Sequence, residues 1–301
     1  MKVLSSEALA CYRKAGRIAA RVRRSTRDFV RRNRPVIDVC EKVEKMILDE
    51  GGEIAFPCNV GINEVAAHYT SPLDDHSRIP SGSLVKLDLG VHVDGYIADT
   101  ATTVCLNPRY RSLVEAADQA LACAIRALSP GCLSSHIGKV IEDTVHSYRL
   151  KPIRNLSGHK IERYLLHTGA TIPNVSCFST HRVSEGDVYA IEPFVTLTNF
   201  NGSVSSSKRS HIFRFAGSRR SRDKHDREIA DLIMSRYGTL PFAKRWLERE
   251  LSSEDLQVFD RLVSDKTVSS YPVLVEKTGG PVAQAEHTVL VTEDGCEVFT
   301  A

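Results

Sequence analysis

Two aspartates in one short stretch, Asp88 and Asp99, are spaced so that their carboxylates could share metal ions. The stretch VKLDLGVHVDGYIADTATTV has Asp94-Gly95 at its centre, a preferred pair for a two-residue hairpin turn. Because side chains alternate between faces along a strand, this turn places both carboxylates on one face as diagonal neighbours, roughly 7 Å apart. The hairpin alone is also compatible with two solvated surface acids. If both acids are buried, they need a proton or a positive charge nearby.

Two glutamates and two histidines stand in contexts unlike those of surface polar residues. Glu192 follows the apolar run VYAI, and Glu286 precedes the apolar run TVLV. The separation between His159 and His167 corresponds to roughly 26 Å along a strand or roughly 12 Å along a helix. We therefore expect that these two histidines do not bind the same ion. Each of the four residues, taken alone, could be an ordinary hydrogen-bonded polar group.

Taken together, four carboxylates and one imidazole form a ligand set that is rich in oxygen and poor in nitrogen. Such a set suits Mn²⁺, Fe²⁺, Co²⁺ or Zn²⁺. The carboxylates carry a charge of about −4, which two divalent cations would balance. Two metal ions can lower the pKa of a bridging water, polarise a carbonyl and stabilise a tetrahedral oxyanion. The set therefore points to hydrolysis of a peptide bond.

Helical and strand patterns alternate along the chain and predict an α/β (α+β) protein with a single catalytic domain, residues 1–301. Helices are expected at 6–31, 38–51, 110–128 and 134–148, and strands at 54–104 and 187–194. Residues 213–275 form a helix-like segment, with candidate helices at 227–237, 241–249 and 253–262, and we expect this segment to be a helical insertion subdomain. The final stretch predicts a second hairpin with its turn at Asp294-Gly295.

Composition and charge are those of a globular protein, with a net charge of +3 over 301 residues. We find no signal peptide and no apolar run that could span a membrane, so we expect a cytoplasmic protein that does not bind membranes. The eight cysteines include no CxxC pair, which favours reduced thiols. Two segments are strongly basic: a helix around Arg13 to Arg34 and a loop around Lys208 to Arg227. They are either solvated faces or, as a sharper hypothesis, contacts with ribosomal RNA near the emerging nascent chain.

Five stretches in the same order resemble the motifs of the type 2 methionine aminopeptidases. They are AFPCNVGINEVAAHYT, LDLGVHVDGYIADTATT, GHKIERYLLHTGATIPNV, GDVYAIEPF and QAEHTVLVTEDG, and they are distributed over most of the chain. The resemblance implies the pita-bread fold, in which two pseudo-symmetric α/β halves enclose a dinuclear metal centre on a curved antiparallel sheet. It also implies removal of the N-terminal initiator methionine from nascent proteins, with a preference for small second residues.

The resemblance assigns a role to each site residue. Asp88 would chelate one metal ion, Asp99 and Glu286 would bridge both ions, and His159 and Glu192 would complete the second. Glu192 would also carry the proton from the nucleophilic water to the leaving amine. Two histidines that are not ligands, His68 and His167, would position the substrate and stabilise the oxyanion. His68 would be the residue alkylated by fumagillin-type epoxides. The methionine side chain would lie in an apolar pocket of Phe56, Leu166 and Tyr271, which discriminates only modestly between similar side chains.

Two alternatives share parts of this pattern. A proline-specific aminopeptidase or prolidase of the same fold has the same five ligands, but usually carries an N-terminal domain before the first of them. A non-catalytic pita-bread protein that binds RNA or proteins typically lacks the ligands. The early position of Asp88 is expected of the short, archaeal-style form of the family, for which a monomer is the usual state.

Overall fold

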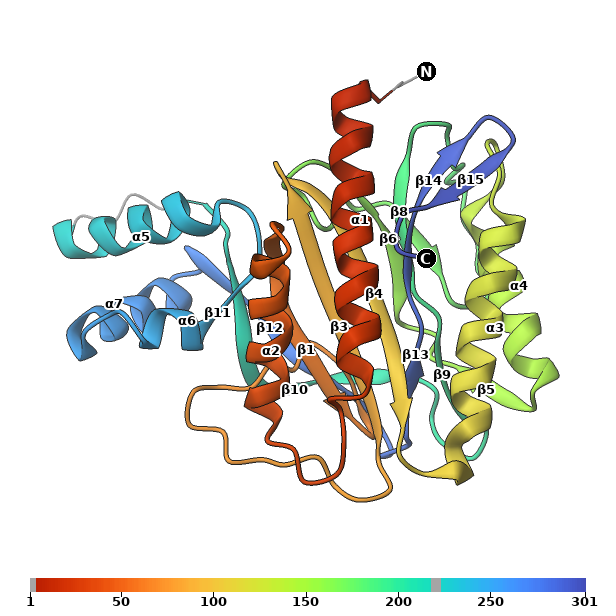
Figure 1. The fold of residues 1–301 in the computed structure, drawn as a ribbon, viewed down its shortest axis with the longest axis horizontal. Coiled ribbons are helices and arrows are strands. Elements are labelled where there is room, and N and C mark those ends of the chain that lie inside the picture. The colour runs from red at the N-terminus through yellow and green to blue at the C-terminus, as the bar shows by residue number, and fades with distance from the viewer. Residues whose placement is uncertain (1–3, 218–222) are drawn as a thin grey trace.

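The computed structural model describes residues 4–217 and 223–301, and consists of two similar halves with a helical segment at one side (Figure 1). Each half has a pair of long helices that covers one face of its antiparallel strands. The helices are α1 Ser6–Arg27, α2 Val36–Asp49, α3 Arg111–Ala127, α4 Ser134–Ser147, α5 Lys224–Tyr237, α6 Lys244–Glu248 and α7 Ser253–Ser264, with a 3₁₀ turn at Pro108–Tyr110. None of these helices in the described ranges is long and apolar enough to cross a membrane. The eight cysteines are free thiols.

Strands of the described residues form four antiparallel sheets. Their orders are β1-β3-β4, β11-β10-β12-β2, β13-β9-β5 and β15-β14-β8-β6-β7. The strands are β1 Glu53–Ile62, β2 Val65–Ala67, β3 Leu84–Val93, β4 Tyr96–Cys105, β5 Leu150–Pro152, β6 Ser157–Ile161, β7 Thr171–Pro173, β8 Val188–Ile191, β9 Phe194–Leu197, β10 Val204–Phe215, β11 Phe242–Ala243, β12 Val268–Glu276, β13 Ala283–Gln284, β14 His287–Thr292 and β15 Gly295–Val298.

Each half has its own apolar core. In the first half, α1 and α2 direct buried side chains such as Val22 and Val43 onto Leu87 and Val91 of β3. In the second half, α3 and α4 direct Leu113 and Ile141 onto the strands around Tyr189. These helices are amphipathic, so burial of one face against a sheet explains both where they form and how they stack.

The first predicted hairpin has the predicted register. Val93 pairs with Tyr96 and Asp88 pairs with Ala101, so the turn is formed by Asp94 and Gly95. Both turn residues have positive φ, 52° and 79°, as a type I′ turn requires.

The predicted turn of the second hairpin was wrong by one residue. Thr292 pairs with Gly295, which places Glu293 and Asp294 in the turn instead of Asp294 and Gly295. Neither of these two residues has positive φ, whereas Gly295 has a φ of 153°. The glycine therefore follows the turn instead of forming it. Such a turn needs its glycine at the start of the next strand, and the sequence pair Asp-Gly does not distinguish the two arrangements.

The predicted helical segment lies between two long strands. β10 and β12 pair with each other, and β12 also pairs with β2 of the first half. The ends of the range 213–275 are therefore strands, and helices α5, α6 and α7 lie between them around a small core that includes Phe242 and Phe259. The first part of the basic stretch interpreted as a loop, up to Phe215, is strand β10, and its last residues, from Lys224, begin helix α5. Its residues 218–222 lie outside the described residues. That the helical segment is an inserted subdomain stays a prediction.

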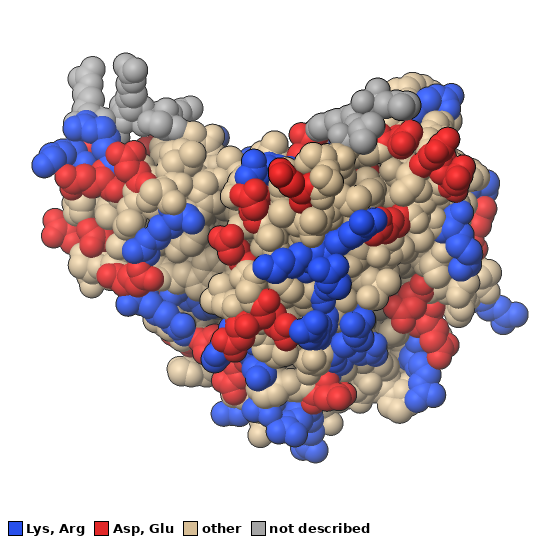
Figure 2. Space-filling model, turned by 45° about the horizontal axis from the view of Figure 1, so that its top comes forward, with Lys and Arg blue, Asp and Glu red and all other residues tan. Residues whose placement is uncertain are grey.

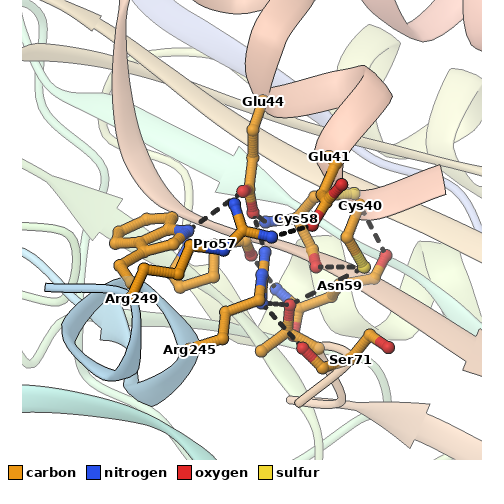
Figure 3. A network of polar contacts seen from close by, with 11 residues as sticks. Cys40, Glu41, Glu44, Pro57, Cys58, Asn59, Ser71, Arg245 and Arg249 are labelled. Atoms are coloured by element: carbon orange, nitrogen blue, oxygen red, sulfur yellow. Dashed lines mark hydrogen bonds and ion pairs between the residues drawn. The ribbon is translucent and has the colours of Figure 1, made fainter. Parts of the chain in front are cut away.

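A buried ion pair fastens this helical segment to the first half (Figure 3). The guanidinium of Arg245 on α6 contacts the carboxylate of Glu44 on α2, and the two side chains are 1% and 9% exposed. Trp246 Nε1 donates to the same carboxylate at 3.0 Å, and the backbone N–H of Cys58 donates to it at 3.2 Å. Arg245 also donates to the Thr70 hydroxyl at 2.6 Å. One carboxylate thus joins α6, α2 and β1.

The same contact explains an irregularity in β1. The register between β1 and β3 shifts between Phe56 and Asn59, so this part of β1 bulges. Pro57 has no N–H to donate, and Cys58 donates to Glu44 instead of to a neighbouring strand. Bulges of this kind re-aim side chains, and here they turn those of Phe56 and Asn59 toward one pocket.

Replacing Arg245 with alanine should lower the free energy of unfolding by about 3 kcal/mol, because it leaves the buried Glu44 carboxylate without its cation. Arg249→Ala provides the matched control, since the Arg249–Glu41 pair lies on neighbouring turns but is 47% and 40% exposed. Exposed pairs contribute about 0–1 kcal/mol. Urea unfolding of both variants would measure the difference, and equal losses would show that burial of the Arg245 pair is not what matters.

Candidate metal centre

One pocket collects all ten side chains that the sequence singles out. Its walls also contain four residues that the sequence analysis did not name, Asn59, Ala67, Ile212 and Pro241. The ten predicted residues that line it are Phe56, His68, Asp88, Asp99, His159, Leu166, His167, Glu192, Tyr271 and Glu286. They come from both halves and from the helical segment. The pocket therefore lies where these three parts of the chain meet.

The potential metal ligands lie closest together at the centre of the pocket. One ligand atom each of Asp99, His159 and Glu286 lies within 4.8 Å of the other two. Nε2 of His159 is 3.5 Å from Oδ2 of Asp99 and 3.7 Å from Oε1 of Glu192. Asp88 lies near enough to Asp99, Glu192 and Glu286 for their charges to affect one another. The five residues thus form one group of four carboxylates and an imidazole.

Burial makes this group unstable as a set of free anions. Burial, followed by the neighbouring carboxylates, raises the pKa of Asp88, Glu192 and Glu286 well above the usual value. Burial raises the pKa of Asp99 to about 8. Among the described residues that line the pocket there is no lysine or arginine. Arg23, outside the pocket lining, favours the anion of Glu286, but one guanidinium cannot balance four carboxylates. The remaining charge must be balanced by protons or by cations from outside the chain.

The donor set fits divalent metal ions. Oδ1 of Asp88 and Oδ1 of Asp99 are buried without a hydrogen-bond partner, although an isolated buried carboxylate oxygen is costly. Carboxylate oxygens with one imidazole nitrogen are the donors that borderline divalent ions accept. Burial lowers the pKa of His159 to about 4, so its imidazole is neutral at pH 7 and has a lone pair to offer.

The predicted separation of His159 and His167 was wrong. Their ring centroids are 4.2 Å apart, because the chain reverses between them. The backbone of Glu162 and that of Leu165 exchange two hydrogen bonds of 2.9 Å, which closes a tight turn. Burial, and then the neighbouring His159 and His68, lower the pKa of His167 to about 2. Both imidazoles are therefore neutral and face the same pocket.

A seam of threonine hydroxyls joins β4 of the first half to residues 284–288 of the second. Thr100 Oγ1 donates to the carbonyl of Glu286 at 2.8 Å, and Thr103 Oγ1 donates to the carbonyl of Gln284 at 2.7 Å. Thr288 Oγ1 accepts from the Asp99 N–H and donates to the Asp99 carbonyl, both at 2.7 Å. These contacts fix the backbones that carry Asp99 and Glu286, so the seam sets the distance between the two carboxylates.

Gln284 contacts two of the carboxylates and was not predicted from the sequence. Its side-chain nitrogen Nε2 is 3.4 Å from Oε2 of Glu192 and 3.4 Å from Oε2 of Glu286, and it is 1% exposed. Gln284 and Glu286 are two positions apart on an extended stretch, so their side chains lie on one face, and this spacing could have identified Gln284. Asn59 was missed because the bulge that turns it into the pocket depends on a contact with α2.

The apolar end of the pocket combines Phe56, Leu166 and Tyr271 with His68. The rings of His68 and Tyr271 meet edge to face, with centroids 5.4 Å apart. Nδ1 of His68 is 3.3 Å from the carbonyl of Pro272, an acceptor, so Nδ1 carries the proton and Nε2 is an acceptor. His68 has a φ of 63°, which is rare for residues other than glycine and common at functional sites.

The chain is similar in sequence and in fold to known proteins. Residues 10–293 match the sequence pattern of metallopeptidase family M24. The methionine aminopeptidase of Methanothermobacter thermautotrophicus is 47% identical over 96% of this chain and 97% of its own. A thermophilic Arx1 structure superimposes with a TM-score of 0.86 at 19% identity, covering 99% of this chain and 91% of its own. The crystal structure of a methionine aminopeptidase from Thermotoga maritima has a TM-score of 0.72 at 20% identity, covering 100% and 99%.

Loading the purified protein with Mn²⁺ should raise its melting temperature by about 5 °C relative to protein treated with a chelator, because cations relieve the repulsion among buried carboxylates. Asp99→Ala should abolish most of this increase. Asp143→Asn, which alters an exposed acid on α4, should leave it intact. Calorimetric scans of the three proteins measure the shift. A metal-independent melting temperature in the unaltered protein would contradict metal binding at this centre.

Proposed function

The chain belongs to metallopeptidase family M24 and has the pita-bread fold, and from this we infer that it is a methionine aminopeptidase that removes the initiator methionine from nascent proteins. It is a hydrolase that uses divalent metal ions. The observation that carries the assignment is the convergence of all ten predicted side chains on one pocket in a chain so similar to archaeal methionine aminopeptidases.

We propose that the centre holds two ions. Two divalent cations balance four carboxylates, whereas one would leave a net charge of about −2 in a buried pocket. Asp88 would hold one ion, His159 and Glu192 the other, and Asp99 and Glu286 both. When bound, such ions supply a water of lowered pKa and polarise the scissile carbonyl. Co, Mn, Fe and Zn all accept these donors, and availability in the cell decides among them.

Side chains of the protein have the other roles in the reaction. Glu192 accepts the proton of the attacking water and delivers it to the leaving amine. His68, whose Nδ1 donates to Pro272, offers Nε2 as an acceptor for a substrate N–H. His167 stabilises the oxyanion. Phe56, Leu166 and Tyr271 line the apolar end of the pocket and would surround the methionine side chain, and we propose that small second residues are preferred.

Release of methionine from Met-Ala-Ser is the direct test. The metal-free protein, reconstituted with Mn²⁺, Co²⁺ or Fe²⁺, should release methionine and should not cleave Ala-Pro peptides. Cleavage only before proline would instead identify a proline-specific aminopeptidase or prolidase. Metal-independent RNA binding without any hydrolysis would identify a non-catalytic binding protein.

Glu192→Gln should keep the fold and lower kcat about 10²–10⁴-fold, because an amide cannot accept the proton of the attacking water. Glu293→Gln changes an exposed carboxylate in the second hairpin turn and should retain full activity. Steady-state assays of methionine release, together with circular dichroism, compare the two. Near-normal turnover of Glu192→Gln would exclude its role as proton carrier.

We propose that the protein acts as a monomer in the cytoplasm, where nascent chains emerge, and that its basic segments contact ribosomal RNA. Some basic side chains of α1 are engaged within the protein: Arg13 contacts Glu297 and Arg21 contacts Glu50. Figure 2 shows acidic side chains interspersed with basic ones across the visible face. Salt-sensitive co-sedimentation with ribosomes tests the contact. Unchanged sedimentation after neutralising both basic segments would rule it out.

A further inference from the structure

Asn59 lines the metal pocket and has an unused acceptor. The residue is 5% exposed. Its nitrogen Nδ2 donates to the carbonyl of Pro57 at 3.0 Å, which fixes the orientation of the amide, while Oδ1 is buried without a hydrogen-bond partner. A buried amide oxygen without a partner is costly, so a ligand that donates a hydrogen bond to it is the expected complement.

The position of Asn59 is fixed by the bulge in β1. The N–H of Cys58 donates to Glu44, and Glu44 is held in turn by Arg245, so the backbone at residues 57–59 is anchored to two helices (Figure 3). Asn59 pairs with Asp88 across β1 and β3. Directly opposite residues of an antiparallel pair point to the same face. Two buried oxygens without partners, Oδ1 of Asn59 and Oδ1 of Asp88, therefore lie on neighbouring side chains of one face.

The N-terminal residue of a substrate offers three groups around its α-carbon: a side chain, a carbonyl and a free α-amine. The apolar end of the pocket accommodates the side chain. The neutral histidines and the metal centre accommodate the carbonyl. The amine carries several N–H donors and is the group that complements acceptor oxygens, which the Asn59–Asp88 pair supplies.

We propose that Asn59 is a substrate-binding residue whose Oδ1 accepts a hydrogen bond from the free α-amine of the N-terminal methionine. This inference rests on the proposed function. It assigns to this side chain the recognition of an unblocked N-terminus. A substrate with an acylated amine has only one N–H at this point and carries a bulky group where Asn59 and Asp88 lie, so Asn59 contributes to selection against it.

A chemical pair of ligands isolates this contact. L-methionine and 4-(methylthio)butanoic acid differ only in the α-amine, and their binding to the Mn²⁺-loaded enzyme can be measured by calorimetry. Asn59→Leu should weaken L-methionine about tenfold and leave the amine-free analogue within about twofold, since only the former loses a hydrogen bond. Asn59→Ala, a smaller replacement, should do the same if leucine disturbs folding. The affinity for Mn²⁺ should be unchanged in both variants.

Asn174→Leu is the matched control, because Asn174 is fully buried, has no side-chain partner and lies outside the pocket lining. It should leave both affinities unchanged. Equal losses for the two ligands would mean that Asn59 only shapes the pocket, and a loss of Mn²⁺ affinity would make it part of the metal centre; either result overturns the proposal. If the unaltered enzyme releases methionine and Asn59→Leu binds it normally, the inference alone fails. If the unaltered enzyme neither releases nor binds methionine, the proposed function fails as well.

Discussion

Mutual repulsion among four buried carboxylates is the constraint on which the rest of the structure depends. Asp88 and Asp99 come from β3 and β4, and Glu192 and Glu286 lie next to strands of the second half. Each carboxylate would be more stable as an anion in water than beside the others. In the absence of cations, protons can relieve part of this repulsion, and a rigid frame holds the side chains together. The two apolar cores and the hydroxyl seam supply that frame, so a divalent cation would find a site that already has its shape.

The structure assembles this frame by placing each functional side chain on an element fixed by contacts elsewhere. Asp99 lies on a strand that the seam fastens to the opposite half. Phe56 and Asn59 lie on a bulge whose backbone is held by Glu44. His68 and Tyr271 meet where β2 pairs with β12, the strand that follows the helical segment in the chain. The helical segment is thus attached to the first half by one sheet and one buried ion pair.

Local patterns in the sequence predicted the parts of the site that depend on local geometry. The Asp94-Gly95 turn predicted the register that puts Asp88 and Asp99 on one face. The separation of His159 and His167 could not be predicted, because the chain reverses between them in a tight turn that belongs to no long helix or strand. Asn59 was missed for a related reason, because its position is set by a partner on a distant helix, which periodicity within one segment does not report. Gln284 was missed although its spacing from Glu286 along an extended stretch could have identified it.

The seam also bears on how the enzyme folds. Its hydrogen bonds join residues 181 to 189 positions apart in the chain. Contacts between such distant residues form late, since closing a long loop costs entropy before any contact repays it. Each half has a core of its own and can become ordered first, as units of large proteins generally do. Docking of the halves then creates the pocket, so catalytic competence is acquired in the final step of folding rather than gradually along the way.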